Sequence, residues 1–299
     1  MKAVVISCSH GKHLGEKISK KLKSKHSSLE YEKFPDGELH LRFSDDVKGK
    51  NIVLVQSFYD SKEGNVQDCI VEVLFASHTA KELGASKVIL AAPYFPYFRQ
   101  DKRFRKGDVV SLKAMTALIG KYFDGIIVLD PHLHRQSNVK DVFRIKAEKI
   151  TANKAIADFI RKKLKIKNPV LIGPDEESYK WARNVAEIIK AESYIYEKKR
   201  YSSYHVEVKL GEKAELKGRD IVVVDDIVST GHTILETIKD IKKQKPKSIS
   251  CVCVHGIFAG SILSELSKGR IKIFSTNTIP NSKSRIDVSK EFASAIMNF

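Results

Sequence analysis

The chain has 299 residues, 42% of them hydrophobic, which is enough for one large or two ordinary domains with a sizeable core. No apolar run approaches the ~18 residues that a membrane-spanning helix needs. The net charge of +17 admits a nucleic-acid partner, yet the lysines of runs such as KISKKLKSK fall on the outer faces of amphipathic helices. We therefore expect a solvated basic surface, with no nucleic acid and no membrane as partner.

The N-terminal stretch MKAVVISCSH enters a strand directly and does not resemble a signal peptide. The four cysteines occupy apolar stretches, and Cys251-Val-Cys253 lacks the spacing of a zinc site. We expect buried, reduced cysteines in a cytoplasmic protein.

Short apolar runs then alternate with helical patterns, which predicts an α/β fold with a mainly parallel sheet. The chain also repeats itself. KGKNIVLV at 48–55 is similar to KGRDIVVV at 217–224, and AVVIS near the N-terminus corresponds to PVLIG at 169–173. We predict two copies of one domain, at 1–150 and 151–299. A last helix at 289–299 is left over, and packing back on the first copy is one option for it.

The segment IVVVDDIVSTGHT, residues 221–233, carries the strongest functional signal. Four branched apolar residues predict a buried strand, and Asp225 and Asp226 follow it where the first copy has Gln56 and Ser57. The fold does not require carboxylates there, so we expect them to have a functional role. Ligands of open α/β sheets bind at the carboxyl ends of strands, where an acid pair can accept from a vicinal diol or help to hold a divalent cation.

A polar loop follows the acid pair and precedes a helix expected to begin near Ile234. Its backbone N–H groups and hydroxyls would form an anion site, and a glycine within it allows close approach. A diol site beside a phosphate cradle describes a sugar phosphate such as ribose 5-phosphate. The predicted sugar-phosphate residues are Asp225, Asp226, Ser229, Thr230, Gly231, His232 and Thr233.

This segment resembles the signature of the phosphoribosyltransferase fold, and the two copies with one signature resemble the ribose-phosphate pyrophosphokinase (PRPP synthase) family. FPDGE at 34–38, YFPYFRQDK at 94–102, DPH at 130–132 and GPD at 173–175 match further segments of that family in the right order. The resemblance covers nearly the whole chain. It implies transfer of the β,γ-diphosphoryl group of ATP to the 1-hydroxyl of ribose 5-phosphate, in nucleotide biosynthesis.

The resemblance implies ATP-binding roles for Phe34, Asp36, Glu38, Arg99 and Gln100. Phe34 can stack on adenine, and the guanidinium and amide can hold phosphates and base. In the family the FPDGE turn reaches a neighbouring subunit's site, which implies a homo-oligomer with a shared ATP site. FPDGE by itself predicts no more than a hairpin turn.

The resemblance also implies Mg2+ as cofactor, with His132 and Asp175 as contacts. Mg2+ prefers oxygen and keeps several waters, so substrate phosphates would complete this sparse ligand set. Pro131 departs from the leucine of the family motif and leaves the direction of His132 open, with His134 as a competitor.

Lys198 and Arg200 match the catalytic Lys-x-Arg pattern of the family, and Arg200 is also assigned to ribose 5-phosphate. Their i, i+2 spacing places both on one side of an extended chain. We expect them on a mobile hairpin loop that closes over the charge developing in the transition state. A solvated basic turn is the plainer interpretation of the same residues.

Three alternatives stay open at this point. A base phosphoribosyltransferase predicts a single domain and leaves Arg99, Gln100 and Phe34 unexplained. A catalytically silent regulatory subunit predicts loss of Lys198, Arg200, Asp225 or the phosphate loop, and all are intact. A nucleic-acid-binding protein predicts polyanion affinity that survives physiological salt.

Overall fold

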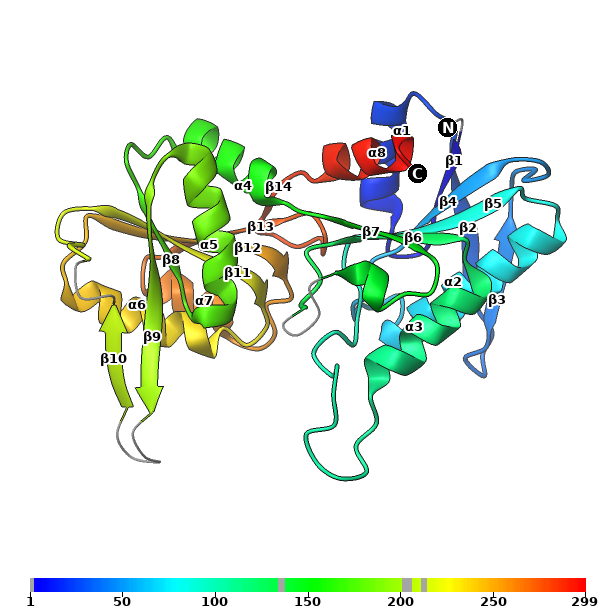
Figure 1. The fold of residues 1–299 in the computed structure, drawn as a ribbon. Helices are drawn as coiled ribbons and strands as arrows, with labels where there is room; N and C mark the ends of the chain where they lie inside the picture. The colour runs from blue at the N-terminus through cyan, green and yellow to red at the C-terminus, as the bar shows by residue number, and fades with distance from the viewer. Residues whose placement is uncertain (1–2, 134–137, 201–205, 211–213) are drawn as a thin grey trace. The chain divides into compact units, whose positions relative to one another are not determined.

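The structure is a computed structural model that describes residues 3–133, 138–200, 206–210 and 214–299, with the backbone alone for 197–200 and 206–210. The chain divides into two compact units (Figure 1). The first comprises Met1–Thr151 and Val288–Phe299, and the second comprises Ala152–Asp287. In the described residues no helix is both long and apolar enough to cross a bilayer.

The described strands of the first unit form one seven-stranded sheet in the order β3-β2-β1-β4-β5-β6-β7. Its elements are β1 (Ala3–Ser7), α1 (Lys12–Leu22), β2 (His26–Lys33), β3 (Leu39–Phe43), β4 (Asn51–Val55), α2 (Val66–Glu82), β5 (Lys87–Ala92), α3 (Ser111–Tyr122), β6 (Gly125–Leu129), η1 (Val139–Asp141), β7 (Lys146–Ile150) and α8 (Ser289–Met297).

The described strands of the second unit form a sheet of the same size in the order β10-β9-β8-β11-β12-β13-β14. Its elements are α4 (Asn153–Phe159), η2 (Ile160–Leu164), β8 (Val170–Gly173), α5 (Glu176–Ile189), β9 (Glu192–Arg200), β10 (Val206–Leu210), β11 (Asp220–Val228), α6 (His232–Lys243), β12 (Ser248–Gly256), α7 (Ile262–Lys268), β13 (Lys272–Thr276) and β14 (Ser284–Ile286).

The two strand orders correspond position by position, which confirms the predicted α/β fold of two related domains. β4 and β11, predicted as equivalent from their sequences, occupy the same place beside β1 and β8. All neighbouring strands run parallel except the pairs β2–β3 and β9–β10 at one edge of each sheet. Parallel strands buried on both faces explain why the apolar runs do not alternate with polar residues.

Helices cover both faces of the second sheet. Ile221 and Val223 of β11 belong to the cluster formed with Ile234 and Ile238 of α6 and with Ile262 of α7. Successive residues of a strand point to opposite faces, so the intervening apolar residues face α5, which lies across β8, β9 and β11 (Figure 1). Burying each such side chain contributes about 1.5–3 kcal/mol before the entropy cost of ordering it.

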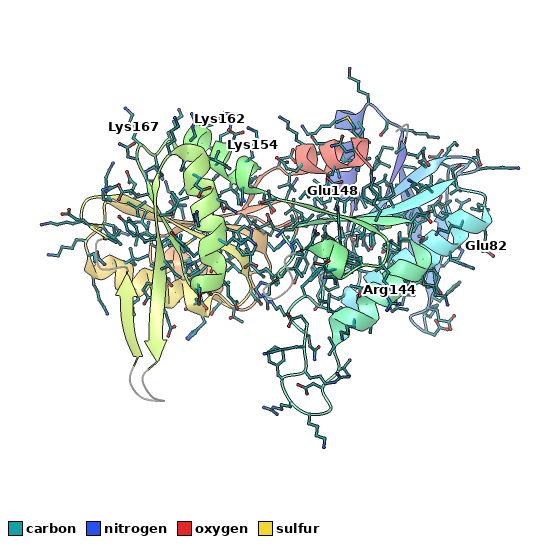
Figure 2. All side chains as sticks on the ribbon, viewed as in Figure 1. Glu82, Arg144, Glu148, Lys154, Lys162 and Lys167 are labelled. Carbon is teal, nitrogen blue, oxygen red and sulfur yellow. The ribbon has the colours of Figure 1, made fainter. Side chains whose placement is uncertain are left out.

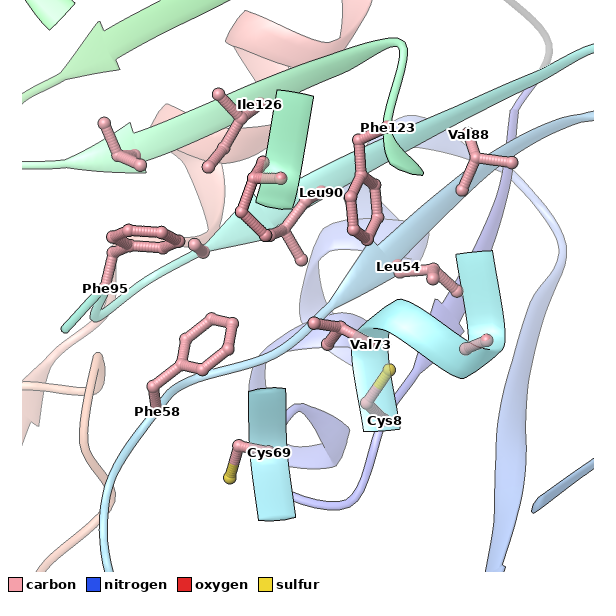
Figure 3. Packing of buried hydrophobic residues seen from close by; sticks show 14 of the residues in the cluster. Cys8, Leu54, Phe58, Cys69, Val73, Val88, Leu90, Phe95, Phe123 and Ile126 are labelled. Atoms are coloured by element: carbon pink, nitrogen blue, oxygen red, sulfur yellow. The ribbon is translucent and has the colours of Figure 1, made fainter. Parts of the chain in front are cut away.

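The core of the first unit is built in the same way (Figure 3). The rings of Phe58 and Phe95 meet edge-on with centroids 5.4 Å apart, and Cys69 of α2 lies in the same cluster. On the opposite face α8 packs against α1. All four cysteines are buried and free of disulfides.

Three element boundaries differ from the sequence predictions. β11 does not end at Val224 but continues to Val228, because it stays paired with β12 through Ile227 and Val228. α6 begins at His232, two residues before the predicted start. Lys198 and Arg200 lie not in a loop but at the end of β9, whose backbone pairs with β10 in antiparallel register.

Candidate active site

The acid pair lies inside the carboxyl-terminal part of β11. Asp225 is 9% exposed and Asp226 4%. Each carboxylate is oriented locally: Asp225 Oδ1 accepts from the N–H of Asp226 at 2.9 Å, and Asp226 Oδ1 accepts from the N–H of Ile227 at 2.7 Å. Burial, followed by the charges of Asp226 and Asp175, raises the pKa of Asp225 well above its ordinary value. Such clustered carboxylates are complementary to a hydroxyl-rich or cationic ligand.

Asp175 comes to this cluster from another element of the same unit. It is the N-cap of α5, directly after β8, and its Oδ1 accepts from the N–H of Ser178 at 2.8 Å and also from the hydroxyl of Ser178. β8 is the neighbour of β11, so the carboxyl ends of both strands meet at one edge of the sheet. Among the described residues, no group of three or more His, Cys, Asp or Glu side chains is close enough to hold a metal ion unaided.

The anion cradle predicted after the acid pair is open. Within the described residues no hydrogen bond uses the backbone N–H groups of 232–234 at the start of α6. The N-cap is Gly231, which has no side chain to satisfy them. Thr230 and Thr233 are exposed beside these groups, whereas His232 is partly engaged by Glu236, with Nε2 3.4 Å from a carboxylate oxygen. Free N–H groups at a helix N-terminus form a site for phosphate.

Gly231 is required in this cradle for two reasons. Its φ of +72° lies in the left-handed region that only glycine adopts at little cost. A Cβ at this position would also stand 2.2 Å from Cδ1 of Ile262, far inside van der Waals contact. The glycine therefore fixes both the direction of the loop and the approach of α7 to it.

The equivalent place in the first unit is closed by the protein's own side chains. Gln56 follows β4 where Asp225 stands in β11, and its amide donates to the Glu72 carboxylate at 2.7 Å. That carboxylate also accepts from the N–H of Ser9 at 2.7 Å and from its hydroxyl at 2.5 Å. Burial raises the pKa of Glu72 to about 7, opposed by these hydrogen bonds. The network also includes His10, whose backbone N–H donates to Oε1 of Gln56 at 2.9 Å.

The helix that follows is closed as well. α2 carries a full capping box, in which the Asn65 side chain accepts from the N–H of Asp68 and the Asp68 carboxylate accepts from the N–H of Asn65. Its first N–H groups therefore have partners within the chain, unlike those of α6. Sequence reasoning missed the Glu72 network. The available signal was a carboxylate on the buried, mainly apolar face of α2.

FPDGE forms the hairpin turn between β2 and β3. The Phe34 N–H donates to the Glu38 carbonyl at 2.9 Å, and Gly37 takes a φ of +95°. The Phe34 ring is 50% exposed and packs only loosely on His40, with centroids 5.7 Å apart. Asp36 accepts from the N–H of Glu38 at 3.1 Å. An exposed aromatic ring at a hairpin tip is available to a ligand or a partner.

Arg99 and Gln100 follow β5. Arg99 is exposed, whereas Gln100 is held by Ser111 of α3, whose hydroxyl donates to its Oε1 at 2.6 Å. β5 stands three strand positions from β2 in the sheet, about 14 Å at the usual spacing. No hydrogen bond or ion pair among the described residues joins either of them to the hairpin turn.

His132 lies directly after β6 in the first unit and is partly buried. The preceding Asp130 is buried at a φ of +37°, a sparsely populated conformation for a residue before proline, and it accepts from the Thr151 hydroxyl at 3.2 Å. His134 lies outside the described residues. For Lys198 and Arg200 the structure gives the backbone, opposite Val208 and Val206 of β10, and their side chains are outside the described part.

Comparison with known proteins is consistent across the whole chain. Residues 3–122 match the N-terminal domain of ribose phosphate pyrophosphokinase, and residues 138–287 match the phosphoribosyl transferase domain. The relatives include the ribose-phosphate pyrophosphokinases of Methanopyrus kandleri, 31% identical over 99% of both chains, and of Methanothermobacter thermautotrophicus, 32% identical over 96% of this chain and 97% of that one. The phosphoribosylpyrophosphate synthetase of Mycobacterium smegmatis shares the fold, with a TM-score of 0.83 at 20% identity over 99% of this chain and 98% of that one.

Fold and site thus define a protein of two phosphoribosyltransferase-type domains, one with an open cradle and one closed by its own side chains. The open cradle lies in the second domain. The chain belongs to the ribose-phosphate pyrophosphokinase family.

Proposed function

We propose that the chain is a ribose-phosphate diphosphokinase, which transfers the β,γ-diphosphoryl group of ATP to the 1-hydroxyl of ribose 5-phosphate and releases AMP. The 1-oxygen of the sugar attacks the β-phosphorus, the bond from that phosphorus to the oxygen of the α-phosphate breaks, and the hydroxyl proton is lost to solvent. No covalent enzyme intermediate is needed. The protein therefore acts by positioning and by stabilising charge.

Ribose 5-phosphate occupies the cradle after β11 in this proposal. Asp225 and Asp226 accept hydrogen bonds from the 2- and 3-hydroxyls, and the N–H groups at the start of α6 receive the 5-phosphate with Thr230 and Thr233. The observation that carries the assignment is the contrast between the two domains. The same fold leaves this place open in one and fills it with Gln56, Glu72 and Ser9 in the other.

Magnesium dependence fits the donors at this place. Asp175, Asp225 and Asp226 supply carboxylate oxygens, the ligands that Mg2+ prefers, and the charges of Asp226 and Asp175 help to raise the pKa of Asp225. Too few protein ligands meet for a closed cage, which suits an ion completed by substrate phosphates and water. When bound, Mg2+ supplies charge neutralisation on the phosphates. His132 is proposed as a Mg2+ contact on the family resemblance alone.

ATP is assigned to the first domain. The exposed Arg99 guanidinium and the amide of Gln100, whose Oε1 is already fixed by Ser111, are placed to hold phosphates and base. Phe34, Asp36 and Glu38 lie at a hairpin tip about three strand spacings away. That separation supports a shared site in a homo-oligomer, where the hairpin of one chain completes the ATP site of another.

Lys198 and Arg200 supply positive charge to the transition state in this proposal. Both lie in the last part of β9, beyond its pairing with β8, where antiparallel β10 is its only neighbour among the described strands. A cation that meets the transferring group only as charge develops raises turnover without tightening ground-state binding. Arg200 is also proposed to contact ribose 5-phosphate.

The test is AMP formation from ATP, with and without ribose 5-phosphate and Mg2+. The proposal predicts AMP that appears only with all three components and in proportion to sugar consumed. A catalytically silent subunit gives no AMP. A base phosphoribosyltransferase instead consumes 5-phosphoribosyl 1-diphosphate when a purine or pyrimidine base is added, and that result would replace the proposal.

A further inference from the structure

A second strongly charged hollow lies in the second domain, at the end of the sheet opposite the sugar cradle. It is a pocket of about 580 Å³ at the amino ends of β11, β12 and β13. Its cations are Lys165 and Lys167 before β8, Lys247 before β12, and Arg270 and Lys272 at the start of β13. The pocket lining contains one carboxylate, Asp220.

Most of this charge has no partner among the residues that the structure describes. Lys247 Nζ lies 3.2 Å from Asp220 Oδ2, and the hydroxyl of Ser248 donates to Oδ1 of the same carboxylate at 2.6 Å. The other four cations make no hydrogen bond or ion pair with any described residue. All of them are exposed, and Figure 2 shows Lys167 projecting outward from the second unit.

Helix C-termini offset part of the positive charge. Segments η2, α6 and α7 end beside the pocket, and each helix C-terminus carries roughly half a negative unit charge. Three such ends and the one carboxylate together carry less negative charge than the five cations carry positive charge. The pocket is therefore electropositive, and it favours an anion.

Size and lining narrow the class of anion. The volume falls in the range of about 300–1,000 Å³ that is typical of small-molecule sites. None of the residues that line it is aromatic, so it offers no stacking surface for a nucleobase. Asp220 and Asp225 are five residues apart on one strand, roughly 16 Å, so this pocket is separate from the sugar cradle.

We propose that this pocket binds a small anion with two or more phosphoryl groups, at a site distinct from both substrate sites. Several separated cations match several negative charges along a short chain, whereas a single orthophosphate would reach only some of them. The inference rests on the pocket and its charges and does not depend on the proposed enzymatic reaction.

Tripolyphosphate is the probe, titrated by calorimetry into the full chain at physiological ionic strength with ribose 5-phosphate and AMP present to occupy the proposed sugar and nucleotide sites. The expected result is one saturable site per chain, with orthophosphate at least tenfold weaker. The double variant Lys167→Gln, Arg270→Gln should weaken tripolyphosphate binding at least tenfold. The control Lys239→Gln, Lys290→Gln removes the same charge from exposed positions outside the pocket and should change it less than twofold.

A cysteine introduced into the pocket tests directly whether the anion binds there. The native cysteines are all buried, so Ile166→Cys adds an accessible thiol to the pocket lining. Tripolyphosphate should slow its alkylation at least fivefold. Equal affinity in pocket and control variants, or an unprotected thiol at saturating tripolyphosphate, would overturn the proposal. Tighter, pocket-dependent binding of a single-stranded RNA would also overturn it, because the occupant would then be a nucleic acid.

Discussion

Asp225 and Asp226 place two carboxylates side by side in a buried strand, with a third from Asp175 near enough to raise the pKa of Asp225 further. Buried like charges are costly unless a ligand or counter-ion compensates them. In the first domain Gln56 stands at the corresponding place with its hydrogen bonds satisfied by Glu72 and His10. The contrast supports the proposal that the acid pair binds a ligand, at a cost in stability.

Replacing Asp225 by asparagine should raise KM for ribose 5-phosphate at least tenfold while KM for ATP changes little. The amide keeps the shape but loses the charge-assisted hydrogen bond to a diol, worth about 1.5–3 kcal/mol. Initial-rate kinetics with each substrate varied in turn measure both constants. Asp220→Asn, at the other end of the same strand, is the matched control and should leave both unchanged. A raised KM for ATP alone would move the sugar site elsewhere.

Glu72 makes the stability of the first domain depend on pH. Its pKa in the folded chain is about 7, above the ordinary 4.5, so the folded state binds the proton more tightly than the unfolded one. The stabilisation that comes from this tighter proton binding is fully present below pH 4.5. It is lost as the pH rises to about 7, which lowers the free energy of unfolding by on the order of 3 kcal/mol. Above that range the effect levels off.

Glu72→Gln should therefore flatten the pH dependence of the unfolding free energy between pH 5 and pH 7, measured by urea denaturation at a series of pH values. Glu82→Gln, at the exposed end of the same helix, is the control and should keep the slope of the natural protein. Identical slopes in all three proteins would mean that Glu72 titrates normally and that its burial carries no electrostatic cost.

At the scale of elements, β9 and β10 form the edge hairpin of the second sheet, and Lys198 and Arg200 end its first strand. The residue spacing predicted an extended segment correctly. It did not predict that the pair belongs to the strand, because basic residues are typical of turns as well as of sheet edges. Similarly, the two aspartates looked like the end of β11, but pairing with β12 extends that strand to Val228.

Lys198→Ala should lower kcat roughly a hundredfold and leave the binding of ATP nearly intact, because the charge acts mainly in the transition state. Lys199→Ala, the intervening lysine, is the matched control and should retain most of the turnover. The double change Lys198→Ala, Arg200→Ala should cost less than the sum of the two single changes if the pair acts as a unit. Near-normal turnover in Lys198→Ala would leave the hairpin as a solvated basic element.

Long-range contacts account for what the sequence could not predict. Apolar periodicity and the repeated KG-x-x-IV-x-V segments were sufficient to predict a mainly parallel α/β fold and its duplication. The Glu72 network joins residues 63 positions apart through hydrogen bonds that leave no local pattern. Site residues on one segment, such as the loop after β11, were predictable as a group. The separation of Arg99 from the hairpin turn becomes apparent only when the strands are placed in order.

At the scale of the whole molecule, two copies of one fold have diverged into an open and a closed form. The proposed ATP-binding residues of one chain lie in two groups. We propose that contact between subunits of a homo-oligomer brings the two groups together in one ATP site. Specific activity should therefore fall as the protein is diluted toward monomer, with a rise in KM for ATP, while the chain stays folded. Sedimentation analysis at the same concentrations checks the assembly. Full activity in a demonstrated monomer would exclude the shared site.

The most direct test of the central claim follows the phosphorus atoms of ATP. With radiolabel at the γ-phosphorus and ribose 5-phosphate present, the label should move to the sugar product, and with label at the α-phosphorus it should appear only in AMP. Asp225→Asn should slow both transfers together at low sugar concentration. Formation of ADP with transfer of a single phosphoryl group to ribose 5-phosphate, or no sugar-dependent transfer of label, would contradict the assignment of a diphosphoryl transfer to this chain.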